Sequence, residues 1–164
     1  MKKFLALLIF AAACAPKVTT TTKTTPVEPA SPASVEPPRA ANQTGGATAR
    51  AAVEEFLSAV RAGDIQAMSV LFGTKSGPSR DNMSRDENEK RLVILQCYFN
   101  HDKSRILGES PGDDGQRVIE VEVTKQGIVR TPSFYAVQGP SNRWYVNNME
   151  IAAVRDFCRK APGT

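Results

Sequence analysis

Residues 47–73 read ATARAAVEEFLSAVRAGDIQAMSVLFG and decide the fold of the C-terminal part of the chain. Within them, apolar side chains recur at the spacing of a helix that buries one face, and these are Val53, Phe56, Leu57 and Val60. Thr48 can cap the start of this helix, and Gly63 can end it. Asp64 can cap a second, shorter helix that Gly73 ends. The stretch therefore predicts two consecutive helices, each with an apolar face.

A third helix is predicted further along the chain. Ser84-Arg85-Asp86-Glu87 has the Ser-x-x-Glu pattern of a capping box, which is typical of a helix start. The helix should run to about Asn100 and bury three apolar side chains, those of Leu92, Leu95 and Phe99. The apolar run at 92–95 could instead form a strand, but the cap and the preceding charges favour a helix. Residues 73–83 are predicted to be a loop because Gly, Pro, Ser and polar residues dominate them.

After His101 the apolar period changes to that of a strand. Apolar and acidic side chains alternate in Ile119–Val123, which predicts one buried and one solvent-exposed face. Glu120 and Glu122 should then point to solvent rather than form a catalytic pair. The segment Val154–Cys158 predicts a helical turn or a strand extension. Further strands are predicted at 104–109, 128–138 and 143–151. Helices followed by an antiparallel sheet make an α+β domain.

Two segments of this domain resemble a known family. Residues 47–73 are similar to the helix pair, joined by a Gly-Asp turn, that opens nuclear transport factor 2-like domains. Residues 142–146, Asn-Arg-Trp-Tyr-Val, resemble their closing strand. The resemblance spans about residues 48–151 and implies a curved antiparallel sheet wrapped around the helices, a cone with a pocket inside. Four side chains become candidates for lining that pocket, namely Tyr98, His101, Tyr135 and Trp144.

The chain begins with a pattern that is typical of exported proteins. A cationic start, Met1-Lys2-Lys3, precedes the ten-residue apolar run Phe4–Ala13. This run is too short to cross a bilayer as a helix. The pattern predicts a secretory signal peptide at residues 1–13. A buried N-terminal strand or helix is the alternative.

Cys14 follows three alanines, a pattern that resembles the lipobox of bacterial lipoproteins. The resemblance implies that Cys14 becomes the first mature residue and carries acyl chains that hold the protein on a membrane. Ala11 stands where the family prefers Leu. Cleavage without lipidation, which leaves a free thiol, is the alternative. Ala15, in place of an aspartate, implies sorting to the outer membrane of the cell envelope, facing the periplasm.

The segment after the cysteine has an unusual composition. Residues 16–44 contain six Pro and seven Thr and no aromatic residue. Such a segment buries too little apolar surface to offset the entropy lost on ordering. Residues 14–48 are therefore predicted to be a disordered tether, and residues 49–164 are predicted to be the α+β domain.

Composition excludes several classes of function. The chain has 164 residues and a net charge of +4, but residues 49–164 hold sixteen basic and fifteen acidic groups, interspersed with one another. The basic stripe of a nucleic-acid-binding protein is absent from the sequence. The one histidine excludes a multi-histidine metal site, and Asp113-Asp114 lacks the spacing of a calcium loop. We therefore expect no metal, no cofactor and no nucleic-acid partner.

Cys97 and Cys158 remain once Cys14 is set aside. In the oxidising periplasm, such a pair suggests a disulfide that would tie the third helix to the C-terminal segment. Two buried reduced thiols are the alternative. Neither cysteine lies in the CxxC context of a redox site.

Three functions are compatible with these features. The first is a membrane-anchored envelope domain, not an enzyme, that binds a small apolar ligand, a glycan or another envelope protein through the mouth of the cone and residues 73–83. The second is a small-molecule lyase or isomerase that uses Tyr98, His101 or Asp102. The third is a spacer that positions an envelope complex. We expect the first because no catalytic motif stands out in the sequence.

Overall fold

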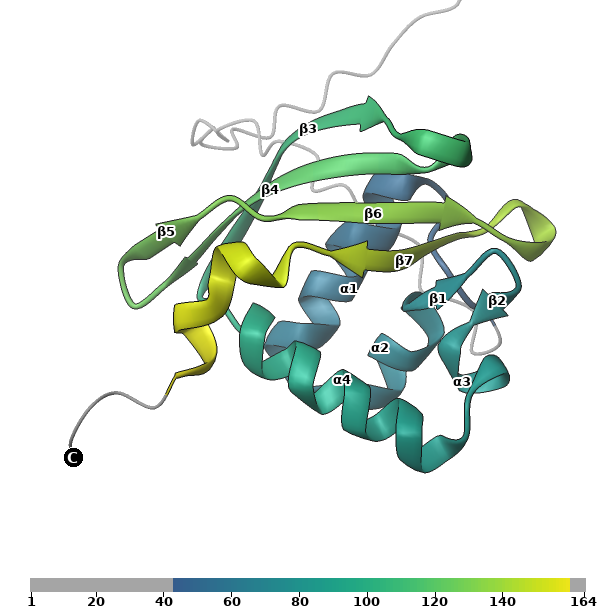
Figure 1. The fold of residues 1–164 in the computed structure, drawn as a ribbon, viewed down its shortest axis with the longest axis horizontal. Helices are drawn as coiled ribbons and strands as arrows, with labels where there is room; N and C mark the ends of the chain where they lie inside the picture. Colours follow the sequence, from purple (N-terminus) through teal and green to yellow (C-terminus); the bar gives the residue numbers. More distant parts are fainter. Residues whose placement is uncertain (1–42, 160–164) are drawn as a thin grey trace, which may run out of the picture. The chain divides into compact units, whose positions relative to one another are not determined.

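The computed structural model describes residues 43–159. They form an α+β fold in which helices pack against an antiparallel sheet, as the sequence predicts (Figure 1). The predicted signal peptide, the predicted acylation of Cys14 and most of the predicted tether lie outside the described residues. No described helix has the length and the apolar character needed to cross a bilayer.

The helices begin at the residues that the sequence predicts. The three longer helices are α1 (Ala49–Ala62), α2 (Ile65–Leu71) and α4 (Arg85–Phe99). Helices α1 and α4 also end where predicted or within one residue of it, whereas α2 ends earlier than predicted, at Leu71, and Gly73 lies in the strand that follows. The side chains of Thr48, Asp64 and Ser84 each accept a hydrogen bond from a backbone N–H in the first turn of their helix, at 3.1, 2.9 and 3.3 Å. Gly63 ends α1 with a φ of 70°, a conformation that glycine adopts without strain.

The main sheet has the strand order β3-β4-β6-β7, and β5 pairs with the end of β4. Its strands are β3 (Lys103–Pro111), β4 (Arg117–Lys125), β5 (Ile128–Arg130), β6 (Ser133–Gln138) and β7 (Trp144–Met149). The helices cover one face of it (Figure 1). That face supplies the buried side chains of Ile119, Val121, Val123, Phe134 and Ala136. Glu120 is exposed, and Glu122 forms an ion pair with Arg105 at 3.1 Å, so the predicted outward direction of both glutamates is confirmed.

The prediction of a loop at residues 73–83 is wrong. This segment forms a small hairpin, β1 (Gly73–Thr74) and β2 (Gly77–Pro78), followed by a short helix, α3 (Ser79–Asn82). The hairpin satisfies backbone groups that a loop would leave to water, and Gly77 has the φ of 118° that its turn requires. The Gly- and Ser-rich composition correctly predicts a turn, but it does not predict that the residues on either side of the turn pair as strands.

The prediction of one continuous strand at 128–138 is also wrong. Pro132 separates β5 from β6, because a proline has no N–H to donate to a neighbouring strand. Its carbonyl still accepts a hydrogen bond from the N–H of Val121 at 3.2 Å. The interruption lets β5 and β6 pair with different parts of β4.

The first described residues are fixed to β7. Gly46 exchanges two backbone hydrogen bonds with Trp144, of 2.7 and 3.0 Å. Arg143 donates to the carbonyls of Thr44 and Gly45 at 3.1 and 2.6 Å, and the hydroxyls of Thr44 and Tyr145 lie 2.9 Å apart. We call this set of contacts the N-terminal clasp. It places residues 43–48, which the sequence assigned to the tether, against the domain.

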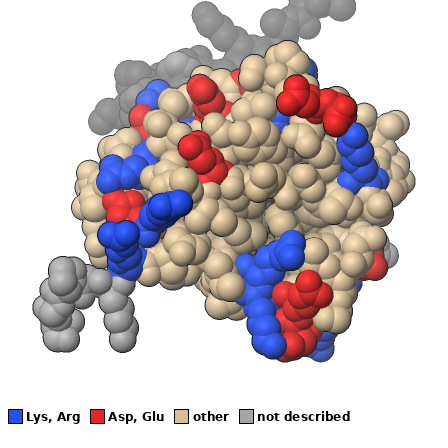
Figure 2. All heavy atoms as spheres, viewed as in Figure 1, with Lys and Arg blue, Asp and Glu red and all other residues tan. Residues whose placement is uncertain are grey.

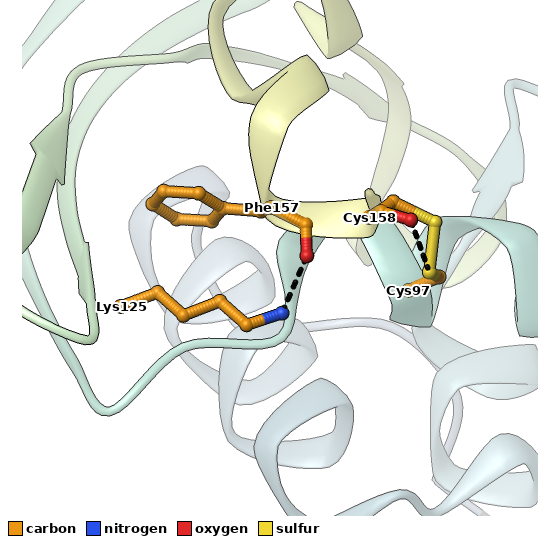
Figure 3. Close-up of a disulfide and its surroundings, with 4 residues drawn as sticks. All are labelled: Cys97, Lys125, Phe157 and Cys158. Carbon is orange, nitrogen blue, oxygen red and sulfur yellow. Dashed lines mark hydrogen bonds between the residues drawn. A yellow bond between two sulfur atoms is a disulfide. The ribbon is translucent and has the colours of Figure 1, made fainter. Parts of the chain in front are cut away.

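The C-terminal segment is fixed to α4 by a disulfide. Cys97 and Cys158 are bonded, with Cα atoms 5.0 Å apart, so the predicted disulfide is present (Figure 3). Cys158 ends a 3-10 helix, η3 (Ile151–Cys158). Lys125 of β4 donates to the Phe157 carbonyl at 2.6 Å, and its Nζ lies 5.8 Å from the centre of the Phe157 ring. The chain after β7 is thus held by both a helix and the sheet.

Candidate functional site

An apolar groove opens between α4 and β7, with a volume of about 440 Å³. Sites for small molecules typically have volumes of about 300–1,000 Å³. We call it the α4–β7 groove. It is lined by Phe72, Glu87, Arg91, Ile94, Leu95, Asn147, Asn148, Met149 and Ile151.

A bulge in β7 explains how consecutive residues of this strand come to line the groove. Ala136 of β6 pairs with Val146, whereas Tyr135, the preceding residue, pairs with Asn148, so Asn147 is an extra residue in β7. In a regular strand, neighbouring side chains point to opposite faces. A bulge breaks this alternation and redirects a side chain. It therefore brings two adjacent amide side chains, Asn147 and Asn148, to one site.

The two amides differ in how much hydrogen-bonding capacity they have left. Asn147 donates through Nδ2 to the carbonyl of Gly73 at 2.9 Å, which orients its Oδ1 as an acceptor. Asn148 accepts through Oδ1 from the N–H of Met149 at 2.9 Å, which leaves its NH2 group as a donor. Both amides that line the groove are thus oriented by a hydrogen bond and keep further hydrogen-bonding capacity.

The rest of the lining is mostly apolar. Phe72, Leu95 and Met149 are buried and form the floor. Ile94 is 55% exposed, which is unusual for a large aliphatic side chain, and it borders the groove. In Figure 2 the surface between α4 and β7 is mostly uncharged, while charged side chains gather over α4. The charged groups of the lining are Glu87 and Arg91, whose closest side-chain atoms lie 4.0 Å apart.

This arrangement suits binding better than catalysis. The lining holds no His, Cys, Ser, Thr, Tyr or Lys side chain that could act as a nucleophile or proton shuttle. Its apolar walls favour an apolar molecule or an apolar side chain, and the two asparagines can orient one polar group on it. Arg91 at the rim could pair with an anionic group of the same molecule.

None of the four predicted pocket residues lines the α4–β7 groove. Tyr98 and Trp144 are half-buried and pack against the core, and Trp144 also bonds through its backbone to the N-terminal clasp. Tyr135 is half-buried on the strand beside β7. His101 is 4% exposed, at the junction of α4 and β3.

His101 and Asp102 have structural partners. The Nδ1 of His101 donates to the Phe99 carbonyl at 2.8 Å, and Asp102 accepts from the N–H of Gln126 at 2.7 Å. Burial lowers the pKa of the His101 imidazole below its usual value, and the charge of Arg61 acts in the same direction. The hydrogen bond to Phe99 and the charge of Asp102 oppose this shift. The imidazole is therefore kept neutral inside the fold.

The groove residues were missed by sequence reasoning, although two signals pointed to some of them. The run Leu92–Leu95 has more apolar residues than one helical face can bury, which indicates that some of them line a surface. The pair Asn147-Asn148 interrupts an otherwise apolar strand, which a bulge would explain. Nothing in the sequence shows that the two segments meet.

The described residues contain no group of three or more His, Cys, Asp and Glu side chains that could hold a metal ion. No protein-family model matches the chain, and no curated protein is significantly similar to it. The site therefore has to be interpreted from its own chemistry.

Proposed function

We propose that this protein is a lipid-anchored domain of the bacterial cell envelope that binds a small apolar molecule in the α4–β7 groove. The observation that carries the proposal is an apolar groove of about 440 Å³, whose wall includes a half-exposed isoleucine and whose strand offers two oriented amides. Such a site provides apolar burial for affinity and a few polar groups for orientation. It contains the features that binding requires, and the one carboxylate of its lining, Glu87, lies beside Arg91.

The proposed location rests on the beginning of the sequence. A short apolar run that two lysines precede and that ends in Ala-Ala-Ala before Cys14 supports export and acylation of Cys14. The Cys97–Cys158 disulfide agrees with an oxidising compartment. Retention at the outer membrane, facing the periplasm, remains part of the proposal.

The fold type is part of the same proposal. Helices that precede an antiparallel sheet and cover one of its faces support a nuclear transport factor 2-like domain, as does the Gly-Asp turn between α1 and α2. In that interpretation the α4–β7 groove is the opening toward the interior between helices and sheet.

Binding can be tested with a pair of neighbouring residues on α4. Val93 and Ile94 are 52% and 55% exposed, but only Ile94 lines the groove. The chain from Ala15 onward should bind the fluorescent apolar probe N-phenyl-1-naphthylamine saturably. Ile94→Asp should weaken this binding at least about tenfold, which is about 1.4 kcal/mol, because it places a charge in the apolar wall.

Val93→Asp is the matched control and should leave probe binding unchanged. Equal effects of the two substitutions would contradict a specific groove and would indicate general surface adhesion. The probe could fail to bind saturably while a protein partner binds the unsubstituted chain but not Ile94→Asp. The occupant of the groove would then be an apolar side chain of that partner and not a small molecule.

The anchor can be tested separately. The full chain made in a bacterium should sediment with membranes, and mass spectrometry should find a mature N-terminus at Cys14 that carries acyl chains. Cys14→Ser should abolish both the acylation and the cleavage before residue 14. Native protein that still begins at Met1 and stays soluble would refute the location.

A further inference from the structure

A second, polar pocket lies among α2, α3 and α4 and has a volume of about 320 Å³. It shares no lining residue with the α4–β7 groove. We call it the α2–α4 pocket. Its lining consists of Ile65, Gln66, Ser69, Arg80, Asp81, Arg85, Asn88 and Glu89.

Asn88 gives this pocket an unpaired acceptor. The residue is 4% exposed, and its Oδ1 has no hydrogen-bond partner within residues 43–159. A buried acceptor left without a donor costs about 1–3 kcal/mol. The nearby hydroxyl of Ser69 donates to the Gln66 carbonyl at 2.7 Å, so its proton is already used. A molecule in the pocket can supply the donor that Asn88 Oδ1 lacks among residues 43–159.

The charges around the pocket are balanced. Arg80 pairs through Nε with Asp81 at 3.4 Å, and Arg85 pairs through Nε with Glu89 at 2.8 Å. Two guanidinium and two carboxylate groups leave the lining without net charge. A strongly anionic or cationic ligand would therefore face as much repulsion as attraction.

The chemical type of the lining is uniform. Six of the eight residues end in a planar amide, carboxylate or guanidinium group. Each such group has two or more donors or acceptors in one plane, so it can bond two neighbouring hydroxyls at once. Ile65 supplies an apolar surface for a C–H face.

We propose that the α2–α4 pocket binds a hydroxyl-rich molecule of the size of a single sugar residue. A hydroxyl of this ligand donates to Asn88 Oδ1, and the rim groups bond its other hydroxyls in pairs. The small volume, at the low end for ligand sites, admits one ring rather than a chain. The site is independent of the groove and of its proposed ligand.

The test is a titration of the full chain, purified in a detergent without a sugar headgroup, with N-acetylglucosamine and with methyl α-glucoside. At least one sugar should bind saturably with a Kd of about 1 mM or below. The side-chain amide signals of Asn88 should shift in NMR spectra during the titration. The amide of Asn82, which donates to the Pro78 carbonyl at 2.8 Å and does not line the pocket, should not.

Two variants separate binding from structure. Asn88→Leu removes the unpaired acceptor, so it should weaken sugar binding at least tenfold without lowering the melting temperature. Gln66→Ala changes an exposed rim residue and should weaken binding severalfold even if the first variant fails to fold. Ile94→Asp, in the groove, should leave sugar binding unchanged.

Three results would overturn the proposal. One is the absence of saturable binding of either sugar, which would leave only water in the pocket. Another is sugar binding that survives both pocket substitutions. The third is preferential binding of inorganic phosphate, used as an anionic comparison ligand, because the balanced charges do not predict it.

Discussion

Helices α1 and α4 have nearly the same length, 14 and 15 residues, but they use their surfaces differently. In α1 every large apolar side chain is buried, and these side chains are Val53, Phe56, Leu57 and Val60. In α4, Leu92 and Leu95 are buried, whereas Val93 and Ile94 between them are more than half exposed. Helix α1 therefore places all of its large apolar side chains in the core.

The difference shows where a binding surface can be found in such a fold. A helix with one apolar face needs only the sheet to cover it. Helix α4 contributes to the core with one side, to the α4–β7 groove with a second and to the α2–α4 pocket with a third. Substitutions on α1 should therefore change stability, and substitutions on the exposed sides of α4 should change binding.

The largest effect should come from the buried side of α1. Phe56 is fully buried, with its ring centre 6.4 Å from that of Phe72. Phe56→Ala should lower the free energy of unfolding by about 3–5 kcal/mol. Ile94→Ala should change it by no more than about 0.5 kcal/mol, because the side chain is half exposed. Urea unfolding followed by circular dichroism measures both, and similar losses would remove the distinction between the helices.

A slightly smaller effect should come from the end of α4. The Cys97–Cys158 disulfide joins residues 61 positions apart, and closing such a loop stabilises a fold by up to about 4 kcal/mol. The double substitution Cys97→Ser and Cys158→Ser should lower the melting temperature by roughly 15 °C. Dithiothreitol should lower that of the unsubstituted protein similarly and leave the double variant unchanged. A melting temperature insensitive to the reductant would mean that η3 is held by its other contacts.

The smallest effect is a pH dependence at the C-terminal end of α4. Because burial lowers the pKa of His101 in the folded state, its contribution to stability is present above the unfolded value of about 6.5. The contribution is lost as the pH falls through the lower, folded value. The free energy of unfolding should therefore fall more steeply between about pH 7 and 5 in the unsubstituted protein than in His101→Gln. Parallel pH profiles would show that His101 is not the titrating group.

The sequence predicted the parts of the fold that local chemistry determines. Thr48, Asp64 and Ser84 cap their helices as expected, because an N-cap depends only on residues within one turn. The alternation around Ile119–Val123 identified the buried face of β4. The hairpin at residues 73–78 and the interruption at Pro132 were missed although their signals are local. Gly73 and Thr74 pair with Pro78 and Gly77, and a proline has no N–H to donate to a neighbouring strand.

The candidate site was harder to predict than the fold. The α4–β7 groove forms where a helix, a bulged strand and Phe72 lie side by side, and no local sequence pattern predicts which distant segments lie together. The four predicted pocket residues followed from the resemblance to nuclear transport factor 2-like domains, which implies a pocket inside a cone. The structure instead uses them, where described, mainly for packing and backbone contacts. A tyrosine, tryptophan or histidine side chain indicates a binding site only when the fold leaves its polar groups without structural partners.

The N-terminal clasp has a mechanical consequence. Any pull on the chain upstream of residue 43 reaches the domain through the contacts of Thr44 with Arg143 and Tyr145 and then through the paired backbone bonds between Gly46 and Trp144. Trp144 begins the same strand whose bulge presents Asn147 and Asn148 to the groove. Tension on the chain before residue 43 therefore acts on the β7 wall of the groove. The opposite wall, on α4, is attached to η3 by the Cys97–Cys158 disulfide.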